Sequence, residues 1–128
     1  MFFLASIGQE LIYRGSVGSP DWFILDFVQD GNWHDLTLPT CVPDNAIAIL
    51  LWSKLFDMEV GSEITFRKKG ELSIYPNFTL RIKTVGACYE ESVGIVFVGD
   101  NKQIEYRQQL YSDPFSGDVE ASVFGWWV

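Results

Sequence analysis

The stretch FTLRIKTV, residues 78–85, alternates apolar and polar side chains more regularly than any other part of the 128-residue chain. Successive side chains of a β-strand point to opposite faces of a sheet, so a period of two indicates a strand rather than a helix. We expect Phe78, Leu80 and Ile82 to face a core, with Arg81 and Lys83 facing solvent or a partner.

Eight further stretches carry strand signals between turn-forming residues. The continuous apolar run 46–56 could form a strand or a short helix. The spacing by two of Ile47, Ile49 and Leu51 favours a buried central strand. The other expected strands are 10–13, 22–28, 33–38, 63–68, 93–98, 102–107 and 119–128.

These strands recur at short and even intervals. The turn signals Asp30-Gly31-Asn32 and Gly99-Asp100-Asn101 predict hairpins between consecutive strands. Such a pattern is typical of an all-β antiparallel sandwich or jelly roll, here of about eight or nine strands in a domain over residues 21–128. We interpret the less regular residues 1–20 as an amino-terminal attachment segment.

Charge and composition exclude several classes of protein. A formal net charge of −8 argues against nucleic acid or an anionic membrane as partner, because phosphate binding needs a basic face. The apolar run 46–52 is far shorter than the roughly 20 residues of a membrane-spanning helix. Residues 1–5 lack the basic region of a signal peptide. We therefore expect a protein made in the cytoplasm that stays there or leaves within a particle.

Sequence motifs for catalysis, cofactors and metals are missing, and we expect none of the three. His34 is the only histidine, which leaves too few ligands for structural zinc. Without a secretion signal, Cys41 and Cys88 are expected to be reduced thiols. The acidic residues could in principle act as paired carboxylates in glycoside hydrolysis or as loop ligands for calcium. Exposure to solvent on strand faces and in turns explains them better than either role. Those acidic residues are Asp57, Glu59, Glu90, Glu91, Glu105, Asp113, Asp118 and Glu120.

The end of the chain, VFGWWV at 123–128, places aromatic rings at consecutive positions and hence on both faces of one strand. A monomeric sandwich has a polar outer face there, so we expect the outer face to be buried by another subunit. The alternative is a central strand covered by a loop. The residues we expect to anchor the core and the subunit interface are Phe124, Trp126 and Trp127, joined at the interface by Arg67 and Arg107.

Aromatic residues next to turns suggest a second kind of site. Jelly rolls that bind carbohydrate present aromatic rings on a face or loop, although such rings also cover the end of a small core. A carbohydrate-binding, lectin-like module is therefore the alternative function. Its candidate glycan contacts are Tyr75, Tyr89, Tyr111 and Phe115.

A series of short motifs occurs in a fixed order between residues 22 and 127. The motifs are Trp33-x-x-Leu36, Pro43-x-x-Ala46, Phe66-Arg67-Lys68-x-Gly70, Arg81, Lys102-x-Ile104-Glu105-Tyr106-Arg107 and Val123-x-Gly125-Trp126-Trp127. This series resembles a β-sandwich domain of bacteriophage virion proteins, found in tail or head fibres and in related particle-surface proteins.

The resemblance implies a structural, non-enzymatic module that commonly forms a trimer and projects from the particle. We therefore expect a homotrimeric virion component of the head-fibre, decoration or tail-fibre type. Its expected partners are another capsid or tail protein of the same virion and a host receptor, which includes a host-surface glycan.

Overall fold

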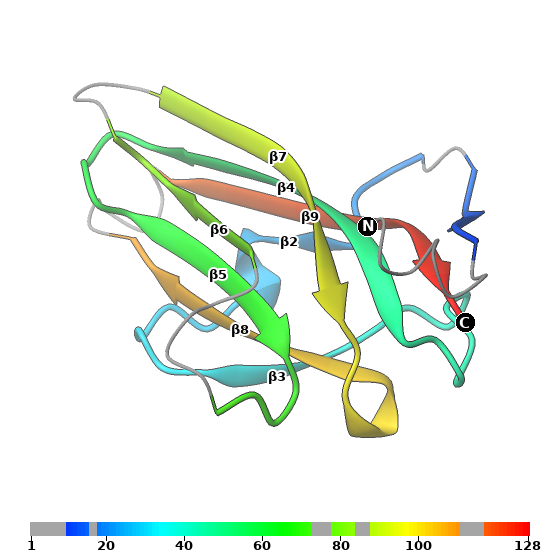
Figure 1. The fold of residues 1–128 in the computed structure, drawn as a ribbon. Coiled ribbons are helices and arrows are strands. Elements are labelled where there is room, and N and C mark those ends of the chain that lie inside the picture. The colour runs from blue at the N-terminus through cyan, green and yellow to red at the C-terminus, as the bar shows by residue number, and fades with distance from the viewer. Residues whose placement is uncertain (1–9, 16–17, 73–77, 84–87, 111–116) are drawn as a thin grey trace.

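The computed structural model describes residues 10–15, 18–72, 78–83, 88–110 and 117–128. In these residues the regular structure consists of β-strands and two one-turn 3-10 helices (Figure 1). The elements are β1 (Ile12–Tyr13), β2 (Trp22–Phe23), η1 (Ile24–Asp26), β3 (His34–Thr37), β4 (Ala48–Asp57), β5 (Glu63–Lys68), β6 (Phe78–Arg81), β7 (Cys88–Phe97), η2 (Asp100–Lys102), β8 (Gln103–Gln109) and β9 (Asp118–Trp127).

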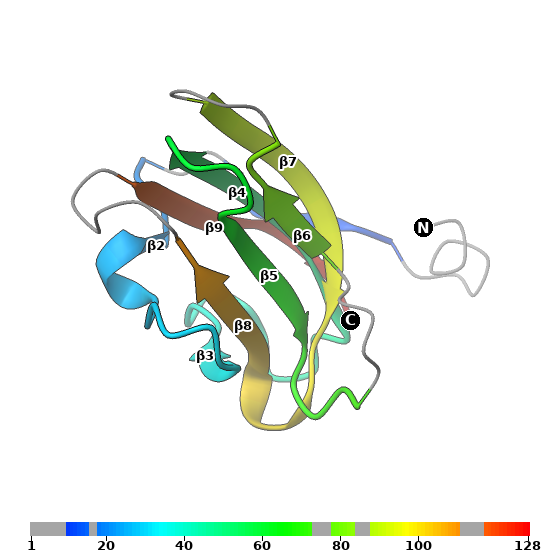
Figure 2. The ribbon, with the colours of Figure 1, turned by 90° about the vertical axis from the view of Figure 1, so that its left-hand side faces the viewer.

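The strands form two antiparallel sheets that lie as facing layers (Figures 1 and 2). Sheet A has the order β1-β9-β4-β7, with β2 beside β1 on the same edge of β9, and sheet B has the order β3-β8-β5-β6. From β2 onward, every connection except β5–β6 crosses between the sheets. This is the strand order of a jelly roll, and it confirms the predicted all-β sandwich. Strand β1 lies within the predicted attachment segment, yet it pairs with β9 in sheet A.

The core lies between the two sheets and follows the predicted alternation. Phe78, Leu80 and Ile82 are all buried. The Phe66 ring stacks on Phe78, with 5.9 Å between ring centroids. The run predicted as a central strand is β4, which pairs with β7 on one side and β9 on the other.

The predicted strand 22–28 is wrong beyond Phe23, where the chain turns into η1. The Phe23 amide donates a hydrogen bond to the Asp26 carboxylate (2.8 Å), and the Phe27 amide donates to the Ile24 carbonyl (3.2 Å). A local side-chain acceptor of this kind competes with the sheet for backbone donors. Phe27 then enters the core rather than extending the strand.

The two predicted hairpins are also wrong, although both turns exist. Gly31 has a φ of +75°, as a tight turn requires. However, β2 before this turn belongs to sheet A and β3 after it to sheet B. The Gly99 turn likewise leads from β7 in sheet A through η2 to β8 in sheet B. Each turn therefore forms a corner of the sandwich.

The turn before β3 supports a prediction about Asp30. The His34 ring Nε2 lies 2.8 Å from the Asp30 carboxylate, and this hydrogen bond, followed by that of the Asn32 amide, lowers the pKa of Asp30 below 3.8. Stability from these contacts is present above the unfolded pKa and is lost as pH falls through the lower folded pKa. We expect His34→Ala to raise the Asp30 pKa toward 3.8 in a carboxyl-carbon NMR titration. Thr37→Ala, at the other end of β3, is the control, and an unchanged Asp30 pKa in His34→Ala contradicts the prediction.

Candidate functional site

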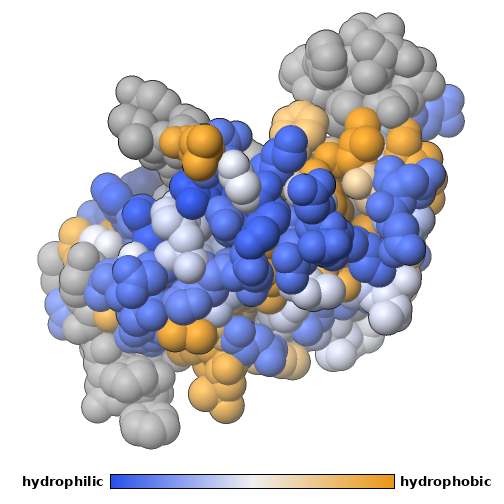
Figure 3. All heavy atoms as spheres, turned by 90° about the horizontal axis from the view of Figure 1, so that it is seen from below, coloured by the Kyte–Doolittle hydropathy of each residue, from blue (hydrophilic) through white to orange (hydrophobic). Residues whose placement is uncertain are grey.

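The outer face of sheet B carries paired charges around one indole ring. The Trp33 ring has the guanidinium carbons of Arg67 and Arg107 at 3.7 and 4.9 Å from its centroid. Arg67 Nε donates to Glu105 Oε1 (2.8 Å), and Arg107 Nη2 lies 3.4 Å from Glu63 Oε1. Figure 3 views the molecule from below, where β3 lies in Figure 1, and shows hydrophilic residues across the middle of this view with hydrophobic groups toward its edges. The charges on this face are matched within the chain.

The structure therefore places the predicted interface residues Arg67 and Arg107 in a network on sheet B. Arg67 pairs with Glu105 and Arg107 pairs with Glu63 across strands, and Arg81 also pairs with Glu63 (2.5 Å). Fully exposed ion pairs contribute about 0.2–1 kcal/mol each, whereas the Arg67–Glu105 pair is partly buried. The chief effect of these pairs is to fix strand register and to keep this face polar.

The outer face of sheet A carries more apolar side chains, beside one Lys54–Glu120 ion pair. The outward positions of β4 include Leu50, Trp52 and Phe56, all half-buried. Their cross-strand neighbours on β7 include Val93 and Tyr89, which are 46% and 65% exposed. Aromatic and aliphatic side chains thus continue across the strands on the solvent side of the sheet.

Strand β9 places its rings on both faces, as predicted. Trp126 is packed in the main core, and Trp127 lies on the outer face in a second cluster with Ala48, Leu50 and Ile95. Phe124 also lies outward and is half-buried, because a β-bulge opposite Leu50/Leu51 shifts the register of β9. Of the three predicted anchors, Trp126 belongs to the core, whereas Phe124 and Trp127 belong to the outer face.

One end of this face forms a continuous apolar surface, which we call the terminal patch. The strand register brings Tyr13, Leu50 and Ile95 into one row across β1, β9, β4 and β7, with Trp127 and Phe97 in the next row. Tyr13 is 65% exposed and Phe97 is 41% exposed. Patches that are apolar and poor in charge mark interaction sites on soluble proteins.

Next to the terminal patch lies a small cavity, which we call the Trp52 cleft. It has a volume of about 230 Å³. The Trp52 and Phe124 rings form one wall, with 6.1 Å between their centroids and 6° between their planes. Trp52 Nε1 donates a hydrogen bond to Glu91 Oε1 (2.9 Å), which fixes the orientation of the indole. The residues that line the cleft are Gly18, Ser19, Pro20, Trp52, Ser122 and Phe124.

A second part of the lining, residues 18–20, is tied to β9 by the adjacent Asp21. The Asp21 amide donates to Ser122 Oγ (3.0 Å), and its carboxylate accepts from the Val123 amide (2.9 Å). Arg14 Nη1 lies 2.6 Å from the same carboxylate, a hydrogen bond that raises the pKa of the guanidinium. Both parts of the lining are therefore held in place by interactions within the chain.

Of the predicted glycan contacts, only Tyr89 lies in the described part of the chain. Its ring packs against Phe56, with 4.9 Å between centroids, and Lys54 Nζ lies 5.3 Å from its centroid. Tyr75, Tyr111 and Phe115 lie outside the described residues. Sequence reasoning missed Trp52, although a signal was present: if Ile49 and Leu51 face inward, alternation places Trp52 outward.

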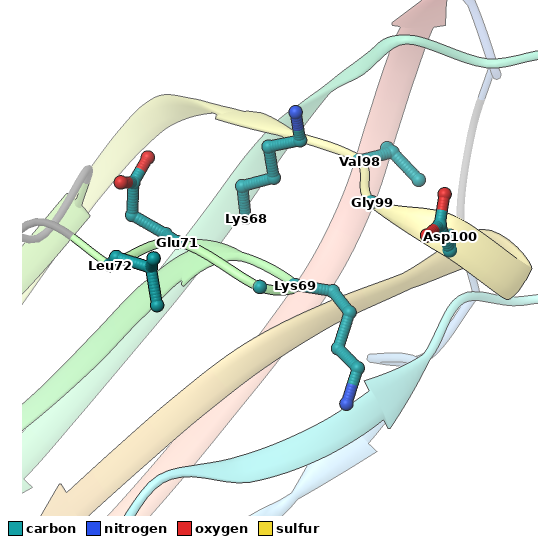
Figure 4. Close-up of a pocket in the computed structure, with 8 residues that line it drawn as sticks. Lys68, Lys69, Glu71, Leu72, Val98, Gly99 and Asp100 are labelled. Carbon is teal, nitrogen blue, oxygen red and sulfur yellow. The ribbon is translucent and has the colours of Figure 1, made fainter.

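A larger cavity of about 590 Å³ lies between the β5–β6 connection and η2 (Figure 4). Glu71 and Asp100 lie at opposite sides of it, and Lys69 extends away to pair with Asp35 (2.5 Å). Charges of both signs around an open cavity favour no single ligand. Among the described residues, no group of three His, Cys, Asp or Glu side chains could hold a metal ion.

The remaining sequence predictions concern cysteine and the membrane. Cys41 is an exposed, free thiol, and the side chain of Cys88 lies outside what the structure describes. In the part of the chain that is described, no helix has the length and apolar character needed to cross a bilayer.

Fold and surface together define an all-β jelly-roll protein with one face of paired charges and one aromatic face. No protein-family model matches the chain, and comparison with curated proteins finds no match.

Proposed function

We propose that this chain is a non-enzymatic structural protein of a bacteriophage particle. In this proposal it is displayed on the particle surface as a homotrimer of the head-fibre, decoration or tail-fibre type. It binds other virion proteins or a host receptor. The jelly roll supports this role because it is a common fold of capsid proteins.

The contrast between the two outer faces carries the proposal. The sheet B face has matched charges, whereas the terminal patch on sheet A exposes Tyr13 and Phe97 around the buried Trp127. Subunit interfaces are enriched in aromatic residues and depleted of charge at their centre. We therefore assign the terminal patch to the contact between subunits, which retains Trp127 as a predicted interface residue.

The surroundings of the acidic residues support a structural role. Glu105 pairs with Arg67, and Glu120 Oε2 lies 3.3 Å from Lys54 Nζ. Asp57 is buried and accepts a hydrogen bond from Ser62. These three carboxylates hold strands and turns in place, which is a structural use of groups that the sequence also allowed as hydrolytic candidates.

The terminal patch supports a test of the oligomeric state. We expect the wild-type protein at micromolar concentration to scatter light as a particle of three times the 14.6 kDa chain mass. The double substitution Tyr13→Asp and Phe97→Asp should convert it to a monomer, because it buries two unpaired charges in the contact. Leu72→Asp is the matched control, since Leu72 is 94% exposed on the β5–β6 connection and outside the patch. A wild-type monomer of 14.6 kDa contradicts the trimer.

Membership of a virion has a separate test. We expect the chain to be detected by mass spectrometry in purified particles of the phage that encodes it, and antibodies to label it on intact particles. Genes for capsid or tail proteins should flank its own gene. Absence of the chain from purified particles would contradict the virion assignment, whatever its oligomeric state.

A further inference from the structure

We propose that the Trp52 cleft binds a single pyranose ring of a neutral sugar. The proposed virion role supplies only the biological use of this site, as a contact to a host-surface glycan. The binding itself rests on the geometry and chemistry of the cleft.

The size of the cleft restricts the ligand. Its volume of about 230 Å³ is below the roughly 300–1,000 Å³ of pockets that take drug-sized ligands. Residues 18–20 line it together with the rings of Trp52 and Phe124. A space of this size fits one sugar ring, with the rest of a glycan extending into solvent.

The aromatic wall suits the apolar face of a sugar. A pyranose ring presents C–H groups on its broad faces and hydroxyl groups around its edge. The C–H face packs on an indole or phenyl ring, and aromatic side chains supply large apolar contact areas. The hydrogen bond from Trp52 to Glu91 and the nearly parallel Phe124 ring fix this wall before a ligand arrives. Binding therefore orders few groups, which lowers its entropic cost.

Polar side chains outside the lining of the cleft lie near the aromatic wall on the same face of sheet A. Glu91 accepts the indole hydrogen bond, and Lys54 and Glu120 form an ion pair in the next row of the same face. An ionised carboxylate has about four acceptor positions, so Glu91 and Glu120 retain capacity for sugar hydroxyl groups. An apolar wall with a few polar groups at its edge is the usual composition of a small-molecule site.

The charges near the cleft select among ligands. The charged side chains near the cleft are Glu91, Lys54 and Glu120, of which two are carboxylates, and the whole chain has a net charge of −8. An acidic sugar would therefore meet repulsion that a neutral sugar avoids. An apolar side chain from a partner protein would use the aromatic wall but would leave these polar groups without new hydrogen bonds. A neutral pyranose uses both.

The test uses the full chain and a panel of methyl glycosides of glucose, galactose, mannose and N-acetylglucosamine, with sialic acid as the anionic probe. Binding is followed by saturation-transfer NMR and by tryptophan fluorescence. We expect saturable binding of at least one neutral glycoside and none of sialic acid. Trp52→Ala should weaken the affinity by about tenfold or more, because it removes the stacking wall.

A second variant adds a bulky side chain to the lining of the cleft without removing Trp52 or Phe124. Gly18 lines the cleft, has open space where a Cβ would stand and has no positive φ, so Gly18→Phe adds a ring there without backbone strain. This folded variant should lose sugar binding. Trp33→Phe, on the opposite sheet, is the matched control and should bind as the wild type does.

The outcomes separate this proposal from the proposed function. If no neutral glycoside binds, or if Gly18→Phe binds as well as the wild type, the sugar site is wrong. If Gly18→Phe dissociates the trimer while no glycoside binds, the cleft takes a side chain of a second copy instead. The Tyr13→Asp and Phe97→Asp variant should keep sugar binding even as a monomer, so failure of the trimer assignment leaves the sugar site standing.

Discussion

Replacing Gln108 by leucine is expected to raise the free energy of unfolding by about 1–3 kcal/mol. Most substitutions at buried positions lower it, so the sign is distinctive. Gln108 lies on β8 opposite Ile64 of β5, with its side chain fully buried between the sheets. Among the described residues, neither its Oε1 nor its Nε2 has a hydrogen-bond partner.

The expected gain follows from the cost of desolvating an amide. In the unfolded chain the Gln108 amide is hydrogen-bonded to water, and folding removes those bonds without replacement by any residue that the structure describes. Leucine fills a similar volume and has no polar atom, so it keeps the packing and removes the penalty. Gln108→Met tests the same idea with an unbranched side chain.

Urea unfolding followed by tryptophan fluorescence measures the effect. Gln103→Leu is the control at the other end of β8, where the amide donates to Thr37 Oγ1 (3.1 Å) and is exposed. We expect Gln103→Leu to change the free energy of unfolding by less than about 0.5 kcal/mol. A loss of stability in Gln108→Leu would show that the amide is hydrogen-bonded in solution, and would contradict the prediction.

The alternation of apolar and polar residues predicted which side chains face the core, because the face to which each side chain of a strand points depends only on its position within that strand. Phe78, Leu80 and Ile82 are buried as expected, and the rings of β9 lie on both faces of its sheet. The pairing of β4 at the centre of sheet A followed from its continuous apolar run. These features depend on the sequence within one strand.

The sheet to which each strand belongs could not be predicted in the same way. A Gly-containing turn looks alike whether the next strand returns to the same sheet or crosses to the other. Gly31 and Gly99 both lie at crossings. The packing of the Arg67 and Arg107 guanidinium groups on the Trp33 ring was not predicted either. It depends on the strand order of sheet B, in which β3 and β5 lie on either side of β8.

The Trp52 cleft lay beyond sequence reasoning because the residues that line it are distant in the chain. The lining at 18–20 is positioned through Asp21, which binds Ser122 and Val123 about a hundred residues later. No local pattern records such a contact. The outward orientation of the Trp52 side chain was predictable from alternation. That Trp52 and Pro20 line the same cavity was not.

Removing the Asp57 carboxylate is expected to lower the free energy of unfolding by about 3 kcal/mol. Asp57 is the last residue of β4 and is fully buried. Its Oδ1 accepts a hydrogen bond from the Met58 amide (2.7 Å), and its Oδ2 accepts one from the hydroxyl of the buried Ser62. The carboxylate thus closes the turn that leads from sheet A to sheet B.

Asp57→Ala removes both carboxylate oxygens. The Met58 amide then loses Oδ1 as its acceptor, and the buried Ser62 hydroxyl loses Oδ2. Asp57→Asn retains one acceptor oxygen, so we expect it to lose roughly half as much stability in urea unfolding. Asp100→Ala, at an exposed carboxylate in η2, is the control and should change stability by less than about 0.5 kcal/mol.

A double-mutant cycle with Ser62→Ala tests whether the two side chains act together. If their hydrogen bond carries the effect, the double variant should be more stable than the sum of the single changes predicts, by at least about 1 kcal/mol. Additive changes would show that Asp57 acts through its other contacts. A loss below about 0.5 kcal/mol in Asp57→Ala itself would contradict the assignment of this carboxylate as the closure of the β4–β5 turn.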